Sequence, residues 1–353
     1  MKKHVFKITA VMVSIVLIIT MCTGLVIYRA GECLEPADAV LAAGKLSFLN
    51  GTMYKDDTVP TSAPAKKPLA ENSPEPSEAP EKADPVTHSG ESHPVVETMV
   101  SNGNMSYDNI SIRNTTGYDF DPGAVIGADL PFEVEDNRTV QVLIYHTHTC
   151  ESYLDDDSGV YYDDFYPRST DPEKGVMAVG EEIVAALKEQ GIGAVHDTTL
   201  HDYPSYEGSY ARSWETVNSY KEKYPSIKIT IDIHRDAMTS QDGTKYKPTF
   251  EYDGKKASQI MIMTGYDTEG GFDFWDENLI FALKLQKQCE DMYPGMTRPL
   301  NFGEYTYNMN FNNGSLLIEV GTDGNTVGES RLSGRYLGTA LAELLNNNAD
   351  HYQ

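Results

Sequence analysis

Short apolar runs alternate with amphipathic helical patterns over the C-terminal two thirds of the chain, and this alternation most constrains the fold. The runs have the length and the β-branched content of buried strands. They are Val140–Tyr145, Gly193–His196, Ile227–Ile233, Gln259–Thr264 and Leu316–Val320. Helical spacing of apolar residues occurs at 176–187, 211–223, 275–292 and 331–345. The pattern predicts an α/β fold with a central, mostly parallel sheet flanked by helices.

The N-terminal residues predict a membrane anchor. Three lysines lie among the first seven residues, and residues 8–28 contain no charged side chain. An apolar helix of that length can span a hydrocarbon core of about 30 Å. The positive-inside rule places the N-terminus in the cytoplasm and the rest of the chain outside. A cleaved signal peptide is the alternative, but its apolar region is normally shorter. We therefore predict a cytoplasmic tip and transmembrane anchor at 1–29.

A proline-rich stretch follows the predicted anchor. Eight of the 18 prolines lie between Pro60 and Pro94, interleaved with Ser, Ala, Glu and Lys. Such a segment cannot bury enough apolar surface to offset its chain entropy, and proline keeps it extended. We predict a juxtamembrane segment and disordered linker at 30–104, followed by one catalytic domain at 105–353.

The charge balance excludes one class of partner. The chain has 28 Lys and Arg against 53 Asp and Glu, and its net charge is −25. Nucleic-acid binding requires clustered Lys and Arg to neutralise phosphates, so we expect no nucleic-acid partner. Four cysteines in so long a chain do not form a disulfide framework.

Three of the predicted strands end in histidine or carboxylate side chains. His146 and His148, two residues apart, are expected to project from one face of an extended chain, and Glu151 follows within a turn. His234 and Glu319 end the other two strands. Ligands of such sheets usually bind beyond the carboxyl ends of the strands, so we expect these side chains to share one site.

This set of residue types is typical of a catalytic zinc site. Two imidazoles and one carboxylate can hold Zn²⁺ and leave one position open for water. A further carboxylate that is not a ligand can take a proton from water and pass it to the leaving nitrogen. The alternative is that each histidine is satisfied structurally at its strand end.

The chain resembles the stage II sporulation protein P family in four blocks that occur in the same order. The blocks are YHTHTCESY, HDYPSYEGSYARS, IDIHRDA and LLIEVG. That family consists of membrane-anchored cell-wall hydrolases of endospore-forming Gram-positive bacteria, similar in fold to zinc-dependent N-acetylmuramoyl-L-alanine amidases. The resemblance in sequence covers roughly residues 105–350. The predicted N-terminal anchor and variable linker that precede these residues are also typical of the family.

The resemblance implies an amidase-like (phosphorylase/hydrolase-like) fold, peptidoglycan as substrate and Zn²⁺ as cofactor. The implied reaction is hydrolysis of the N-acetylmuramoyl-L-alanine amide, and the family is also credited with cutting peptide cross-links. It acts during forespore engulfment together with stage II sporulation proteins D and M. The implied location is the cell membrane, with the catalytic domain between the mother-cell and forespore membranes.

The resemblance also implies roles for individual residues. His234 corresponds to the later histidine ligand of the amidases, and Glu319 corresponds to their catalytic glutamate. Glu151 takes the role of the glutamate ligand. Either His146 or His148 supplies the remaining ligand, and position at the strand end favours His146 slightly.

Three residues next to His234 are candidates for orienting its imidazole or for binding substrate. Asp232 and Asp236 flank it, and either can orient its imidazole through the second ring nitrogen. Asp236 can equally pair with Arg235 and do no more. Arg235 can hold a carboxylate of the stem peptide through a bidentate contact.

Two other functions compete with the zinc amidase. Cys150 lies beside histidines and can act as a nucleophile with His146 or His148 as its base, which describes a Cys150-dependent hydrolase. The second is a non-catalytic peptidoglycan-binding scaffold, which would be expected to have lost Glu319. We expect Tyr206 to contribute to packing rather than to contact substrate.

Overall fold

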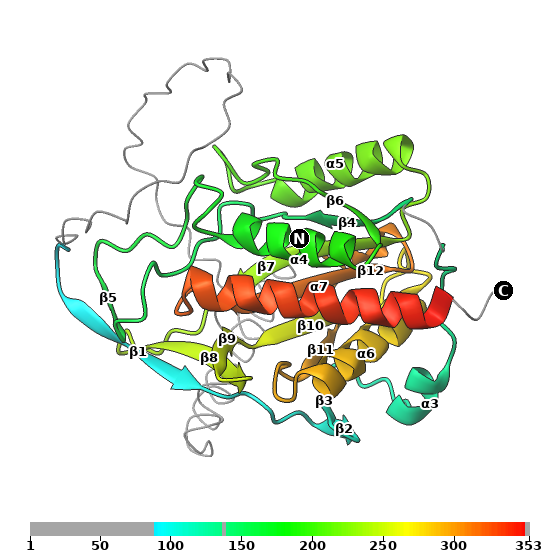
Figure 1. The fold of residues 1–353 in the computed structure, drawn as a ribbon, viewed down its shortest axis with the longest axis horizontal. Coiled ribbons are helices and arrows are strands. Elements are labelled where there is room, and N and C mark those ends of the chain that lie inside the picture. The colour runs from blue at the N-terminus through cyan, green and yellow to red at the C-terminus, as the bar shows by residue number, and fades with distance from the viewer. Residues whose placement is uncertain (1–87, 136–138, 350–353) are drawn as a thin grey trace, which may run out of the picture. The chain divides into compact units, whose positions relative to one another are not determined.

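The computed structural model describes residues 88–135 and 139–349 (Figure 1). The predicted membrane anchor and most of the predicted linker lie outside these residues. Among the residues described, no helix is both long enough and apolar enough to cross a membrane.

The larger of two sheets contains eight strands within the described residues. They are β2 (Met105–Tyr107), β3 (Ile110–Asn114), β4 (Val140–Tyr145), β6 (Gly193–His196), β7 (Ile229–Asp236), β10 (Ile260–Gly265), β11 (Leu300–Gly303) and β12 (Ser315–Thr322). Their order is β2-β3-β11-β10-β12-β7-β4-β6. Five of the seven neighbouring pairs are parallel, and the pairs β2–β3 and β10–β12 are antiparallel. Strands β12, β7, β4 and β6 form a continuous parallel block whose carboxyl ends share one edge.

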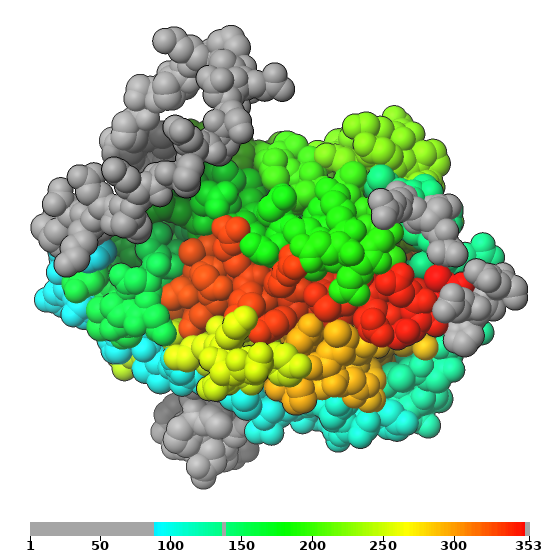
Figure 2. Space-filling model, viewed as in Figure 1, coloured from blue at the N-terminus to red at the C-terminus, as the bar shows by residue number. Residues whose placement is uncertain are grey.

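Helices cover both faces of this sheet. They are α3 (Pro122–Gly127), α4 (Val176–Glu189), α5 (Ser209–Lys223), α6 (Trp275–Met292) and α7 (Val327–Ala349), with a 3₁₀ helix η1 (Met309–Phe311). Helix α7 lies between α4 and α6 on one face (Figures 1 and 2). Val142 and Ile144 of β4 belong to the main core. Leu143 and Tyr145 belong to a separate core that includes Val217 of α5. Alternate residues of β4 therefore reach two cores, and the sheet is the middle of three layers.

A second, four-stranded sheet contains β1 (Ser92–Thr98), β5 (Val160–Tyr162), β8 (Lys245–Tyr252) and β9 (Lys255–Ser258), in the order β5-β1-β8-β9. Strand β1 pairs in parallel with β8 and antiparallel with β5. It lies within the stretch 30–104 that was predicted to be linker, so the folded part of the chain begins before residue 105. Its backbone partners lie far along the chain, which local composition cannot reveal.

Several predicted elements are confirmed. The strands at 140–145 and 193–196 and the helix at 275–292 have the expected bounds. Asp253 and Gly254, with φ of 50° and 69°, form a tight turn between β8 and β9. The last helix begins at Val327 rather than at 331, because Thr326 and Glu329 form a reciprocal capping box with N–H···O distances of 3.0 and 3.1 Å.

Candidate active site

Three strand ends bring the predicted residues to one edge of the larger sheet. In the parallel pair β7–β12, His234 lies beside Glu319. In the parallel pair β4–β7, Tyr145 lies beside Asp232. The turn 146–151 follows β4 directly, so its side chains lie next to the ends of β7 and β12.

His234 is buried between two carboxylates. Its Nε2 lies 3.0 Å from Oδ1 of Asp232, and its Nδ1 lies 3.5 Å from Oε2 of Glu151. Burial lowers the pKa of His234, but the negative charges of both carboxylates outweigh it and hold that pKa well above its ordinary value. Asp232 is itself fixed by the N–H and hydroxyl of Thr147, at 2.7 and 2.6 Å. Asp232 is therefore placed to orient the His234 imidazole.

Glu151 is placed by the backbone of β7. Its Oε2 accepts a hydrogen bond from the N–H of Arg235 at 3.0 Å. Burial raises the pKa of Glu151, but the contact with His234 outweighs it and lowers this pKa to about 2. Glu151 therefore stays ionised at neutral pH and offers a carboxylate beside the imidazole of His234.

His148 faces His234, with ring centroids 5.2 Å apart and nearly perpendicular planes. Its Nε2 lies 2.9 Å from the hydroxyl of Tyr206. Its Nδ1 lies 3.4 Å from Oγ of Ser209 and 3.9 Å from Oδ2 of Asp202. Burial lowers the pKa of His148 to about 4, so the ring is neutral at pH 7.

His146 points elsewhere. Its Nδ1 lies 2.9 Å from the carbonyl oxygen of Ile233, and its Nε2 lies 2.8 Å from Nε2 of His196. A Cβ on Gly180 would lie 2.8 Å from that same His146 nitrogen, so the ring packs against α4. Strand β4 ends at Tyr145, and the turn that follows breaks the alternation expected of an extended chain. The geometry therefore favours His148 over His146 as the metal ligand, against the slight preference from strand position.

Glu319 is a buried carboxyl without a full set of partners. Its exposed fraction is 6%, and its Oε2 has no hydrogen-bond partner among the described residues. Burial raises its pKa to about 8, and the nearby carboxylates of Asp236 and Glu151 act in the same direction. A carboxyl with a pKa near neutrality is suited to accept and return a proton.

Arg235 is not free to bind substrate. Its guanidinium donates hydrogen bonds to the carbonyl oxygens of Ser152, Asp236 and Pro167, at 3.0, 3.2 and 2.7 Å. These contacts hold the segment after β4 against the end of β7. The side chain of Asp236 pairs with Arg298, at 2.8 Å, and not with the guanidinium of Arg235.

Cys150 is poorly suited to nucleophilic attack. The side chain is buried, and burial together with nearby Asp202 raises the pKa of its thiol to about 12. A thiol with so high a pKa supplies very little thiolate at neutral pH. Cys150 and Cys289 are both free thiols, so they do not form a disulfide.

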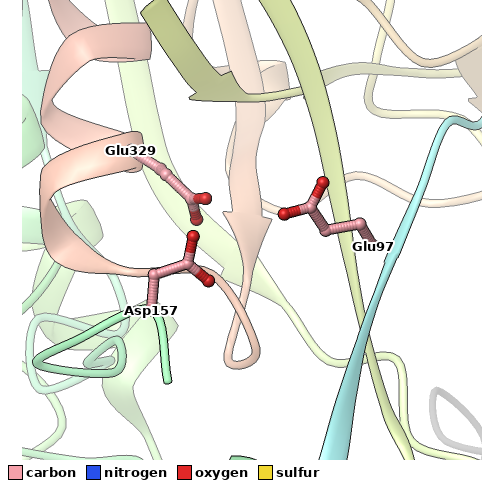
Figure 3. Close-up of side chains that lie close together, drawn as sticks. All are labelled: Glu97, Asp157 and Glu329. Carbon is pink, nitrogen blue, oxygen red and sulfur yellow. The ribbon is translucent and has the colours of Figure 1, made fainter. Parts of the chain in front are cut away.

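A cluster of acidic side chains lies outside this site. The carboxylates of Glu97, Asp157 and Glu329 point toward one another (Figure 3) and lie within 4.8 Å of each other. The buried ammonium of Lys247 lies 3.5, 2.5 and 2.8 Å from them. The lysine therefore offsets part of the negative charge of the three carboxylates, and the cluster fastens β1 to the N-terminal end of α7.

The donor set at the strand ends fits zinc. Two imidazoles and one carboxylate, from His148, His234 and Glu151, are the ligand types that catalytic zinc uses. In addition, Oε2 of Glu319 is buried without a hydrogen-bond partner among the described residues. Asp202, which faces Nδ1 of His148, was not singled out by sequence reasoning. Its only signal was its place in the block HDYPSYEGSYARS.

Sequence comparison identifies relatives of the chain. Residues 46–342 match the family described as "Stage II sporulation protein P (SpoIIP)". A protein named stage II sporulation protein P from Bacillus subtilis (strain 168) is 28% identical over 229 residues, which is 61% of this chain and 53% of the relative. The chain thus spans about half the length of the curated relative it matches.

Structural comparison finds solved N-acetylmuramoyl-L-alanine amidases at low similarity. AmiC2 of Nostoc punctiforme has 15% identity and a TM-score of 0.32, covering 60% of this chain and 96% of that one. An amidase from Clostridium difficile 630 has 14% identity and a TM-score of 0.36, covering 62% and 100%. The CwlD amidase of Clostridioides difficile, solved with the GerS lipoprotein, has 11% identity and a TM-score of 0.35, covering 59% and 99%.

Proposed function

Because this chain belongs to the stage II sporulation protein P family, we propose that it is a zinc-dependent peptidoglycan hydrolase of sporulation. The proposed reaction is cleavage of the N-acetylmuramoyl-L-alanine amide bond, with peptide cross-links as a second substrate. The observation that carries the proposal is the register of β7 and β12, which sets His234 beside Glu319. Glu151 and His148 complete a donor set around that pair.

The roles of the side chains follow from their contacts. His148, Glu151 and His234 would hold the zinc ion. When bound, zinc supplies Lewis-acid polarisation of the scissile carbonyl and lowers the pKa of water. Glu319 takes a proton from the attacking water and returns it to the leaving nitrogen of L-alanine. Its buried position raises its pKa to about 8, which makes both transfers accessible near neutral pH.

Neighbouring residues position this machinery. Asp232 holds the His234 ring from the side opposite Glu151, at 3.0 Å. Arg235 contributes its backbone N–H to Glu151 and its guanidinium to three carbonyls of the surrounding chain. It therefore acts in positioning rather than in substrate binding.

The cellular setting is part of the proposal. A single N-terminal helix at 8–28 would anchor the chain in the cell membrane, with the catalytic domain outside the cytoplasm. Stage II sporulation proteins D and M are the proposed partners during forespore engulfment, and the catalytic domain would lie between the mother-cell and forespore membranes.

The test uses the full-length chain in detergent, because a fragment that starts at residue 100 would lack β1. Purified peptidoglycan is incubated with the chain, with a chelator, and with chelator followed by excess zinc. Mass spectrometry then identifies the released ends. New lactyl carboxylates and L-alanine amines that disappear on chelation and return with zinc support the proposal. Cleavage that persists in chelator would point to Cys150, and binding without cleavage would point to a scaffold.

A further inference from the structure

Arg298 is a buried cation at the edge of the sheet that carries the candidate site. Its exposed fraction is 8%, and it lies just before β11. Its N–H donates a hydrogen bond to the carbonyl oxygen of Ile260 at 2.8 Å. Ile260 in turn pairs with Val320, the residue that follows Glu319 on β12. The backbone of Arg298 is therefore separated from β12 by β10 alone, at the end of β12 that carries Glu319.

The side chain of Arg298 extends back across β10 and β12. Its Nη1 lies 2.8 Å from Oδ2 of Asp236 on β7, and β12 lies between β10 and β7 in the sheet. Asp236 follows His234 by two residues, so both side chains project from the same face of β7. The contact therefore crosses β12 on the face of the candidate site. Burial raises the pKa of Glu319 and the charge of Arg298 acts against it, in agreement with a guanidinium near that carboxyl.

Most of the hydrogen-bond donors of Arg298 have no partner. A guanidinium has five N–H groups, and Nη1 is the one nitrogen of this group that bonds to a described residue, Asp236. Nε is buried without a partner in the same part of the chain. Arg235 differs, because its guanidinium donates to three backbone carbonyls. Buried charged groups normally fill their hydrogen-bonding capacity, so the open Nη2 of Arg298 indicates a ligand.

The charge and the place of Arg298 indicate which ligand this is. A guanidinium forms its strongest hydrogen bonds with anionic oxygens such as those of a carboxylate. In the proposed reaction Glu319 returns a proton to the nitrogen of L-alanine, so the stem peptide that leaves begins beside Glu319. That peptide carries carboxylates beyond L-alanine. Arg298 is therefore on the side of the site where an anionic part of the substrate has to lie.

We propose that Arg298 is a substrate-binding residue that holds a carboxylate of the stem peptide through Nη2, while Asp236 keeps the guanidinium in place through Nη1. This inference rests on the proposed peptidoglycan hydrolase and adds the contact that anchors the leaving peptide. Such an anchor sets the position of the peptide along the site, with the nitrogen of L-alanine at Glu319.

The test measures binding without cleavage. The zinc-free, full-length chain in detergent and chelator is mixed with insoluble peptidoglycan at about 0.15 M salt, and its affinity is measured by cosedimentation. The peptidoglycan is used as purified and after its carboxylates have been converted to amides with carbodiimide and ammonia. Arg298→Gln removes the proposed contact. Arg335→Gln is the matched control, because Arg335 is 37% exposed and pairs with Glu189 at the surface.

Thermal unfolding verifies that each variant is folded. Arg298→Gln leaves the carboxylate of Asp236 without its partner, which is costly in a buried place. The double variant Asp236→Asn/Arg298→Gln removes both charges and takes the place of the single variant if that one unfolds. The comparison of the two peptidoglycans with the wild-type chain requires no variant.

The net charge of −25 sharpens the expected result. Removing negative charge from the wall should strengthen the binding of so acidic a chain if only general electrostatics acts. A specific contact predicts the opposite. Amidation should weaken the binding of the wild type and of Arg335→Gln by about 10- to 100-fold, the effect of losing a charge-assisted hydrogen bond. Arg298→Gln should bind native peptidoglycan more weakly by the same factor and should not be weakened further by amidation.

Two results would overturn the proposal. One is a wild-type chain that binds amidated peptidoglycan as tightly as the native form. The other is a folded Arg298→Gln that remains as sensitive to amidation as the wild type. Failure of the proposed hydrolase is recognised separately, because cleavage by the wild type is followed with and without restored zinc, whereas affinity is measured on the zinc-free chain.

Discussion

Replacing Glu319 with glutamine should lower the kcat of the proposed reaction and raise the free energy of unfolding. Glutamine has the shape of the protonated carboxyl but cannot accept a proton from water. Loss of a positioned general base typically lowers kcat by about 10²- to 10⁴-fold. The same change removes a buried acid whose ionisation the fold disfavours, so the variant should be more stable than the wild type at neutral pH.

The stability gain can be worked out from the pKa of Glu319. Burial raises that pKa from 4.5 to about 8, so the folded chain holds the proton more tightly than the unfolded chain does. The loss of wild-type stability caused by ionising Glu319 is absent below about pH 4.5. It grows as the pH rises and levels off above about pH 8. At about 1.4 kcal/mol per pKa unit, it reaches about 3 kcal/mol at pH 7. For a domain of this size that corresponds to roughly 6–12 °C in Tm.

The assay is thermal unfolding of the zinc-free, full-length chain between pH 5 and 8, combined with peptidoglycan cleavage after zinc is restored. Glu215→Gln is the matched control, because Glu215 is an exposed carboxylate of α5 and the change in charge is the same. The difference in free energy of unfolding between Glu319→Gln and the wild type should widen with pH, whereas the control should not. Full cleavage activity in Glu319→Gln would refute the general-base role. A stability difference that stays constant with pH would refute the raised pKa.

Four further substitutions test the assignment of the neighbouring residues. His148→Ala should abolish stoichiometric zinc binding, as measured by metal analysis. His146→Ala should retain zinc binding and lose only stability, as measured by thermal unfolding. The reverse result would identify His146 as the ligand. Asp202→Asn should weaken zinc binding by about 10- to 100-fold, because it removes the carboxylate that faces Nδ1 of the ligand, and an unchanged affinity in a chelator competition would contradict this. Cys150→Ser should retain cleavage of peptidoglycan, and an inactive but folded variant would revive the thiol mechanism.

The fold was predictable where local pattern and tertiary packing agree. The apolar run Val140–Tyr145 is a strand because its alternate residues reach two cores, and the same run showed strand length and composition in the sequence. Strand β1 was missed because most of its side chains are exposed and its partners lie in β5 and β8, far along the chain. Sequence pattern cannot report a strand that is stabilised mainly by backbone pairing.

The candidate site was predictable at the strand ends and less so in the turns. His234 and Glu319 could be placed together because parallel strands end at a common edge. His146 and His148 could not be told apart, because the alternation that relates them stops at Tyr145 and a turn redirects the chain. Asp202 was invisible for a different reason, since its role depends on a contact between two loops that have no periodicity of their own.

The division between strands and loops has a consequence for how this site works. The ladder between β7 and β12 sets the separation of His234 and Glu319, which can change only if the sheet deforms. His148 and Tyr206 lie on segments outside the sheet and are held by side-chain contacts to Asp202 and Arg168. In the proposed zinc hydrolase, proton transfer would therefore be tied to the rigid part of the fold, whereas metal affinity would depend also on contacts between loops. Substitutions in those loops should change zinc binding without moving the general base, so metal loading is the step through which this site can be adjusted independently of its chemistry.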